Sequence, residues 1–233
     1  MIITNRTLLH FILLLCTSQL HTQTQLGASI EDPDPTARIG WTIEFSHDGR
    51  RMVAGAPNAS AEHFLGGKVK VYDFIDGEWE QVGQTLLGRQ ESDYFGTYLS
   101  MSADGSRFAV SVRNPGILDV ESEIIVYELH EGQWDTLGQI LTVGDEDWAG
   151  ASVQLSADGS RIAAFVEDAE GEDVVQAYEL QDGLWSPVGN PIVSDQDFRF
   201  YSALAMSADG QTLAVAGTRN STFWRFRAYR FID

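Results

Sequence analysis

A four-residue motif, Ser-x-Asp-Gly, occurs four times in this chain and constrains its fold more than any other feature. The copies lie 51 to 56 residues apart and are centred on Asp48, Asp104, Asp158 and Asp209. Between the copies a Gly-x-Trp motif recurs, ending at Trp79, Trp134 and Trp185. Self-similarity at this period is typical of solenoids, propellers and arrays. The sequence therefore predicts four copies of one structural unit.

Each repeat predicts four short antiparallel strands. Residues 41–46 of the first repeat alternate apolar and polar side chains, as a half-buried strand does. Asp-Gly then supplies the positive φ angles of a tight hairpin. Two further apolar segments and the Trp segment complete the unit. A single unit cannot bury both faces, so the units are expected to stack and close radially as a β-propeller.

The two ends of the chain predict how this all-β, four-bladed β-propeller of four-stranded antiparallel blades closes. Phe231-Ile-Asp233 repeats Phe74-Ile-Asp76, which leads into the first Trp segment. Residues 24–27 match the outer strand that should come next, with Gln23 in place of the Trp. We therefore expect the N- and C-terminal strands to share one blade. A fragment of a larger propeller and a half-ring completed by dimerisation are the alternatives.

The first 18 residues have the features of a signal peptide. Arg6 precedes the apolar run Leu8–Leu15, and Cys16 and Ser18 are small residues at the −3 and −1 positions of a cleavage site. The run is shorter than the roughly 18 residues that span a bilayer. We expect a secreted, extracellular single domain of residues 19–233 with no membrane span. It would contain no cysteine, so its stability must come from packing.

The charge balance excludes some classes of partner. The chain has 15 Lys and Arg against 34 Asp and Glu, a formal net charge of −19. Nucleic-acid binders neutralise phosphates with clustered Lys and Arg, so no nucleic acid is expected as a partner. An anionic membrane surface would repel the chain for the same reason.

The repeats resemble the FG-GAP repeats of the integrin α-subunit propeller, and most closely those of secreted bacterial and algal proteins. The resemblance rests on Asp93-Tyr-Phe-Gly96, the Ser-x-Asp-Gly motif and Val53-Ala-Gly-Ala-Pro57. It covers nearly the whole mature chain, although Phe-Gly is intact only at Phe95-Gly96. It implies an extracellular interaction or adhesion module. Calcium-binding members carry several aspartates in the first hairpin; here each hairpin has one, so no metal or other cofactor is expected.

Acidic loops between each outer strand and the next inner strand supply the candidate ligand-binding residues. In a propeller these loops gather on one face, where their charges focus a negative potential. The candidates, with the aromatic and cationic neighbours of the acids, are Asp93, Tyr94, Asp145, Asp147, Trp148, Asp197 and Arg199. A cationic partner, a divalent ion or a glycan would fit such a face. A solvated acidic rim is the alternative.

Two other sets of residues bear on that surface. The repeated Trp residues are expected to pack in the core at the rim of the blades, with sugar-stacking platforms as the alternative. Asn58 and Asn220 begin glycosylation sequons on the same predicted face. They would carry glycans only in a eukaryotic source, and the glycans would cover part of the binding surface.

The sequence offers no recognisable catalytic motif. A glycosidase needs two carboxylates that face one cavity, and only Glu44 lies within a first strand. The resulting prediction is a non-enzymatic recognition or adhesion module that binds an extracellular protein or glycan. A monomer is expected, with a ring-completing dimer as the alternative. Two alternative functions are a glycosidase-like secreted hydrolase that uses loop carboxylates and a structural component of a matrix or cell wall.

Overall fold

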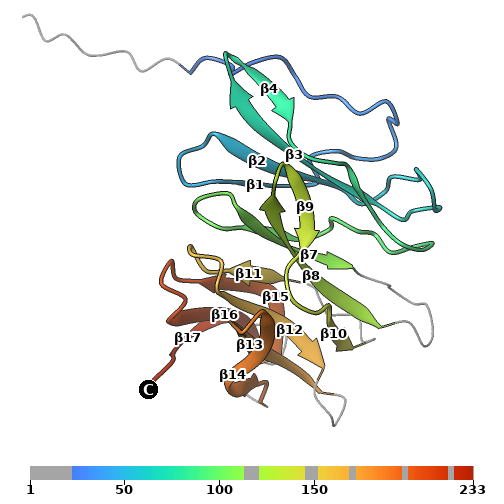
Figure 1. Cartoon of the computed structure of the whole chain (residues 1–233). Coiled ribbons are helices and arrows are strands. Elements are labelled where there is room, and N and C mark those ends of the chain that lie inside the picture. Colours follow the sequence, from blue (N-terminus) through green and yellow to red (C-terminus); the bar gives the residue numbers. More distant parts are fainter. Residues whose placement is uncertain are drawn as a thin grey trace, which may run out of the picture.

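The structure, a computed structural model, describes residues 23–112, 121–144, 152–167, 172–195, 199–219 and 223–232. These residues form strands, turns and irregular segments (Figure 1). In this described part of the chain, no helix is long and apolar enough to cross a membrane.

Four antiparallel sheets follow one another along the chain. The first sheet contains β1 (Thr42–Phe45), β2 (Arg51–Ala56), β3 (Lys68–Ile75), β4 (Glu78–Gln81) and β5 (Leu86–Leu87). The second contains β6 (Leu99–Met101), β7 (Arg107–Val112), β8 (Ser122–His130), β9 (Gln133–Thr136) and β10 (Leu141–Gly144). The third contains β11 (Val153–Leu155), β12 (Arg161–Glu167), β13 (Asp173–Gln181) and β14 (Leu184–Val193). The fourth contains β15 (Arg199–Met206), β16 (Thr212–Arg219) and β17 (Phe223–Arg230).

Each sheet is one sequence repeat, which confirms the all-β prediction. In the first three sheets the strand order runs from the short first strand through the second and third strands to the Trp strand or its extension. The register also repeats, because the tyrosine that recurs in each third strand pairs with the same position of the second strand, as in Met52↔Tyr72 and Ile162↔Tyr178. The fourth sheet has three strands among the described residues, so its expected fourth strand is not confirmed.

The Ser-x-Asp-Gly motif forms the turn between the first and second strands of every sheet. In the first turn Ser46 Oγ donates a hydrogen bond to Asp48 Oδ1 (2.7 Å), which also accepts one from the backbone N–H of Arg50 (3.0 Å). Gly49 has a φ of 68°, in the left-handed region that glycine adopts without strain. The turns also bind each other: His47 N donates to Ala103 O (2.7 Å), and two equivalent backbone bonds link the later turns.

Neighbouring sheets pack face to face, and their shared faces form the core. Val69 and Val71 of the first sheet pack with Leu99 and Met101 of the second, and the same arrangement continues down the stack. In Figure 1 the first sheet lies at the top and the fourth at the bottom, beside the C-terminal end. Residues 23–40 run across the free face of the first sheet (Figure 1). The predicted ring closure is not found among the described residues, because no sheet joins the two ends.

Candidate functional site

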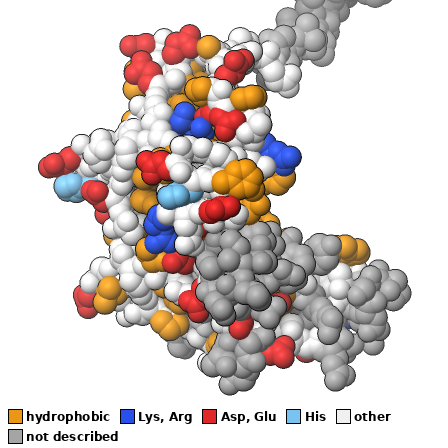
Figure 2. All heavy atoms as spheres, turned by 90° about the vertical axis from the view of Figure 1, so that its right-hand side faces the viewer, with side chains coloured by type: hydrophobic (Ala, Val, Ile, Leu, Met, Phe, Trp, Pro, Cys, Tyr) orange, Lys and Arg blue, Asp and Glu red, His pale blue; other side chains and the backbone are white. Residues whose placement is uncertain are grey.

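Acidic and basic side chains mix on the face of the stack that Figure 2 shows. Three segments that precede the first strand of a sheet are joined by ion pairs to the third strand of a sheet. Asp32 pairs with Lys68 and Lys70 of β3, Arg89 pairs with Glu123 of β8, and Asp195 pairs with Arg227 of β17. The predicted acidic rim is therefore partly neutralised by cations that the repeat pattern alone does not point to.

The Asp32 cluster is the most buried of these ion pairs. Asp32 Oδ1 lies 2.7 Å from Lys68 Nζ, and Oδ2 lies 3.4 Å from Lys70 Nζ. The aspartate side chain is almost fully buried. This burial opposes ionisation of Asp32, but the Lys68 hydrogen bond, the Asp34 N–H and the positive charges of Lys68 and Lys70 outweigh that effect. The pKa of Asp32 therefore lies below its usual value of 3.8.

A cavity of about 310 Å³ opens beside this cluster and is the candidate functional site. Its polar lining comes from Glu31, Asp32, Asp34 and Arg38. Asp34 Oδ1 accepts hydrogen bonds from the N–H (2.9 Å) and the hydroxyl (2.6 Å) of Thr36, which fixes the turn of the loop. The wall of the cavity is therefore held in place by side chains of the loop itself.

Two charged groups in the cavity are available to a ligand. Glu31 is exposed and makes no hydrogen bond or ion pair with any residue that the structure describes. Arg38 is exposed, has a left-handed φ of 58°, and stacks its guanidinium over Trp41 at 5.4 Å from the ring centroid. A carboxylate and a guanidinium thus line one cavity next to a buried ion cluster.

The predicted ligand-binding residues differ in where they lie. Asp93 is buried, and its Oδ2 accepts hydrogen bonds from the backbone N–H groups of Arg89 (2.6 Å) and Gln90 (3.0 Å). It therefore shapes its own loop. Tyr94 is partly exposed in the adjacent turn, with a φ of 44°. Asp145, Asp147, Trp148 and Asp197 lie outside the described residues, and Arg199 is described only as the first residue of β15.

The acid of the first strand, Glu44, stands without a second carboxylate on the neighbouring inner strands. Burial raises the pKa of Glu44 above its usual 4.5. The equivalent residues in the next two sheets are Ser100 and Gln154. The inner strands therefore do not present the pair of carboxylates that a glycosidase uses. In the described residues, no group of three or more acidic, His or Cys side chains is arranged to hold a metal ion.

The repeated Trp and Asp side chains lie at structural positions. Trp134 and Trp185 are almost fully buried, and Trp79 is partly exposed. Each indole N–H donates to a backbone carbonyl of the preceding segment, as Trp134 does to Val82 O (3.0 Å). Hydrogen bonds within the turns lower the pKa values of the motif aspartates, which are Asp48, Asp104, Asp158 and Asp209. Of the sequon residues, Asn58 is partly exposed and Asn220 lies outside the described part.

An arginine that links successive sheets is not among the residues predicted from the sequence. Arg51 pairs with Asp73 of its own sheet (2.6 Å) and donates to Gly105 O of the next (3.0 Å). Arg107 and Arg161 repeat both contacts in the following sheets. The sequence contains a pattern that could have predicted these ion pairs. In each of the first three repeats the second strand begins with Arg, and the third strand carries an acid directly after its Tyr.

Replacing Asp32 with asparagine is expected to lower the free energy of unfolding by about 1–3 kcal/mol. Lys68 and Lys70 would remain buried beside a neutral amide. Because the folded state lowers the pKa of Asp32, its stabilisation is present above the unfolded-state pKa and is lost as the pH falls through the folded-state pKa. Urea unfolding at pH 7 and pH 3 would measure both effects. Glu62→Gln, an exposed loop control, should change little, and an Asp32→Asn variant as stable as the wild type at pH 7 would contradict the argument.

The fold has counterparts among solved structures. A proposed 6-phosphogluconolactonase from Bacteroides uniformis matches 82% of this chain at 17% identity, with a TM-score of 0.55. One from Bacteroides fragilis matches 86% at 14% identity, with a TM-score of 0.51. The matches cover 50% and 53% of those proteins, so the chain spans about half of their length. No family model matches the sequence, and no curated protein does.

These comparisons establish a β-propeller-like fold and correct the predicted function. Both neighbours carry the name of an enzyme, which contradicts the prediction of a non-enzymatic adhesion module and favours the hydrolase alternative. The prediction was wrong because it rested on the lack of a recognisable catalytic motif and of a second carboxylate on the first strands. The charged groups of the candidate site come instead from a loop and from β3. At 14–17% identity the likeness itself extends to the fold alone, and it is the β-propeller fold that this chain shares with them.

Proposed function

We propose that this chain is a secreted hydrolase that opens a carboxylic ester, in the first instance the lactone of a sugar acid, at the cavity beside Asp32. One observation carries the proposal: Glu31 and Arg38, each without an ion-pair partner in the described residues, line the same cavity of about 310 Å³. The names of the two structural neighbours suggest the lactone as substrate.

The chemistry assigns a role to each group. The Glu31 carboxylate takes a proton from a water molecule whose oxygen adds to the lactone carbonyl carbon. The ring C–O bond then breaks, the ring oxygen takes up that proton, and a hydroxy acid leaves. Arg38 binds the negative charge of the substrate, because a guanidinium offers several donors to a phosphate or carboxylate. Asp32, with Lys68 and Lys70, positions the loop that carries Glu31.

Replacing Glu31 with glutamine tests this proposal. Loss of a general base is expected to lower kcat/KM for a phosphorylated sugar δ-lactone about 100-fold. The reaction is followed in a pH-stat by the acid released, after subtraction of spontaneous hydrolysis. Glu80→Gln, an exposed carboxylate on β4, is the matched control and should retain full activity. A wild-type rate equal to the spontaneous rate, or an unaffected Glu31→Gln variant, would refute the proposed function.

The finer classification as an FG-GAP repeat protein is also a proposal, and one contact supports it. The only intact Phe-Gly, at Phe95-Gly96, lies against the Gly-Ala-Pro of the preceding repeat. A Cβ atom added to Gly55 would lie 2.1 Å from Gly96 O, and Gly67 forms an isolated bridge with Phe95. The two halves of the motif are thus partners across one sheet interface, which explains why both are intact at the same place.

Secretion and a single domain of residues 19–233 complete the proposal. They rest on the signal-like residues 1–18, which lie outside the described part of the chain. N-terminal sequencing of the protein recovered from a culture medium would locate the cleavage site, and use of the Asn58 sequon would appear as a mass that falls on deglycosylation.

A further inference from the structure

The inner sheets of the stack follow a simple rule of packing. The forward face of each sheet packs on the backward face of the next. Val69 and Val71 of β3 on the first sheet, and Leu99 and Met101 of β6 on the second, belong to one buried cluster between the two sheets. All four side chains are buried. The rule allows the two outermost faces of the stack to be compared with their buried equivalents.

The backward face of the first sheet is open at its first strand. Ile43 and Phe45 are 46% and 50% exposed, whereas the equivalent Leu99 and Met101 are 3% and 9% exposed. Residues 23–40 cover other parts of this face, where Ile30 and Ile39 pack on Met52, Ala54 and Tyr72. The first strand therefore lacks the sheet that would normally cover it.

The forward face of the fourth sheet is open as well. Phe226 of β17 is 79% exposed, and Ala228 is also exposed, although the equivalent Val69 and Val71 are buried. Trp224, on the same strand, is 64% exposed. The two ends of the stack thus present the two unlike halves of one sheet-to-sheet interface.

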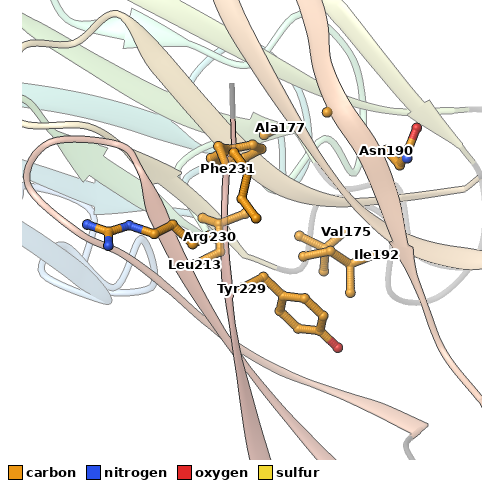
Figure 3. Close-up of a pocket in the computed structure, with 10 residues that line it drawn as sticks. Val175, Ala177, Asn190, Ile192, Leu213, Tyr229, Arg230 and Phe231 are labelled. Atoms are coloured by element: carbon orange, nitrogen blue, oxygen red, sulfur yellow. The ribbon is translucent and has the colours of Figure 1, made fainter.

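A strand position is open at the edge of the fourth sheet. In the described residues β17 pairs with β16 alone. Between β14 and β17 lies a cavity of about 310 Å³, lined in part by Val175, Ile192 and Tyr229 (Figure 3). In the second and third sheets a Trp strand stands at this point, with its indole against Gly83 or Gly138. In the fourth sheet Gly189 faces Phe231 instead.

The segment around Leu26 occupies the matching place at the other end of the stack. Trp79 Nε1 donates to Leu26 O (3.1 Å), as Trp134 Nε1 does to Val82 O (3.0 Å). Val82 directly follows β4, the outer strand of the first sheet, whereas Trp134 belongs to the second sheet. The N–H of Val82 donates to Val71 O of β3 (2.9 Å). Leu26 is therefore placed as the outer strand of a sheet that would precede the first one. Leu26 aligns with Val82, and Ala228 of β17 aligns with Val71, so the expected partner of Leu26 in a third strand is Ala228.

Charge at the two ends is complementary. In the three inner interfaces Arg51, Arg107 and Arg161 reach the turn glycine of the next sheet. In the fourth sheet Thr212 stands at the position of these arginines. Its partner across the strand pair is Arg230, whereas Arg51 has the acid Asp73 as its partner. The fourth sheet therefore carries its cation on the third strand, β17, and not on the second strand. At the first turn, the space around Gly49 is open and Asp48 is exposed.

We propose that two copies of this chain join head to tail into one closed ring. The β17 face of each copy packs on Ile43 and Phe45 of the other, the segment around Leu26 adds a fourth strand to the partner's β17, and Arg230 faces the partner's Asp48. A second copy fits because it presents both missing surfaces, whereas the two surfaces of one copy lie at opposite ends of the stack (Figure 1). When the β17 end of each copy contacts the β1 end of the other, both ends of both copies are used and the assembly closes as a ring. The chain also spans about half the length of its structural neighbours.

The mass of the purified full chain in sedimentation velocity tests the proposal. The wild type is expected at twice the chain mass of 25.8 kDa, less any cleaved signal. Ile43→Asp and Phe226→Asp should each give a monomer, because each places a charge in an apolar interface. Mixing the two variants should restore a dimer through the single intact interface. Leu184→Asp, an equally exposed apolar residue on an inner sheet, is the matched control and should remain dimeric.

A disulfide distinguishes closure between copies from closure within one. Leu26→Cys with Ala228→Cys, in a Cys16→Ser background, should give a covalent dimer on a non-reducing gel. A cross-link within a monomer would overturn the proposal in favour of a four-bladed ring. A wild-type chain that is monomeric at every concentration, or that forms ever larger polymers, would overturn it as well. None of these outcomes depends on the hydrolase activity.

Discussion

Replacing Trp134 with alanine is expected to lower the free energy of unfolding by about 3–5 kcal/mol. The indole is 2% exposed and packs edge-on against Phe108, with the ring centroids 4.9 Å apart. Its N–H bonds to Val82 O, and the side-chain amide of Gln84 bonds to both the backbone N–H and the C=O of Trp134. The alanine variant would leave a cavity between the first two sheets and an unpaired carbonyl.

Chemical unfolding followed by circular dichroism would measure this loss. Trp79→Ala is the matched control, since Trp79 holds the same place in the repeat but is partly exposed. It packs against Phe45, Phe74, the N-terminal segment and the cluster of Met52, Ala54 and Tyr72, but it is not sealed between two sheets, so its loss should be clearly smaller. Equal losses for the two variants would show that burial between sheets does not set the contribution of this residue.

Replacing Gly55 with alanine is expected to destabilise the fold by about 3 kcal/mol, the upper part of the range for overpacking. The new Cβ would lie 2.1 Å from Gly96 O, and backbone atoms cannot move aside as the end of a flexible side chain can. The first and second sheets would have to separate at this point. Thermal unfolding provides the measurement.

Gly77→Ala is the control for that variant, because a Cβ there meets no atom within 4 Å, although φ is 94°. Its cost should be backbone strain alone, about 1 kcal/mol. A Gly55→Ala variant no less stable than Gly77→Ala would mean that the contact with Gly96 relaxes without cost.

Local motifs were sufficient to predict the sheets. Asp-Gly turns such as Asp48-Gly49 and the period-2 alternation of residues 41–46 act over a few residues, so the strands they predict are those observed. The match between residues 24–27 and the segment that ends in Val82-Gly83 was also readable. The structure places Leu26 O against the indole N–H of Trp79, as it places Val82 O against that of Trp134. Whether the ends of the stack meet depends on the curvature summed over all sheets, which no local motif encodes.

The candidate site was harder to predict, because its groups are brought together from distant segments. Asp32 and Lys68 are 36 residues apart, and Lys68 looked like an ordinary polar residue of a strand. Asp93 was expected to face a ligand because acidic loop residues are usually exposed. It is buried because two backbone N–H groups of its own loop converge on one carboxylate oxygen, a geometry that sequence spacing does not reveal.

The backbone hydrogen bonds between the turns have a consequence for how the molecule comes apart. His47, Ala103, Ala157 and Ala208 form one continuous line, in which each turn donates to the next. Every sheet in the middle is anchored from two sides, and each terminal sheet from one. Cooperativity in such a chain passes only between nearest neighbours. In a single copy, melting is therefore expected to begin at the outermost sheets and to move inward, with the second and third sheets the last to lose their order.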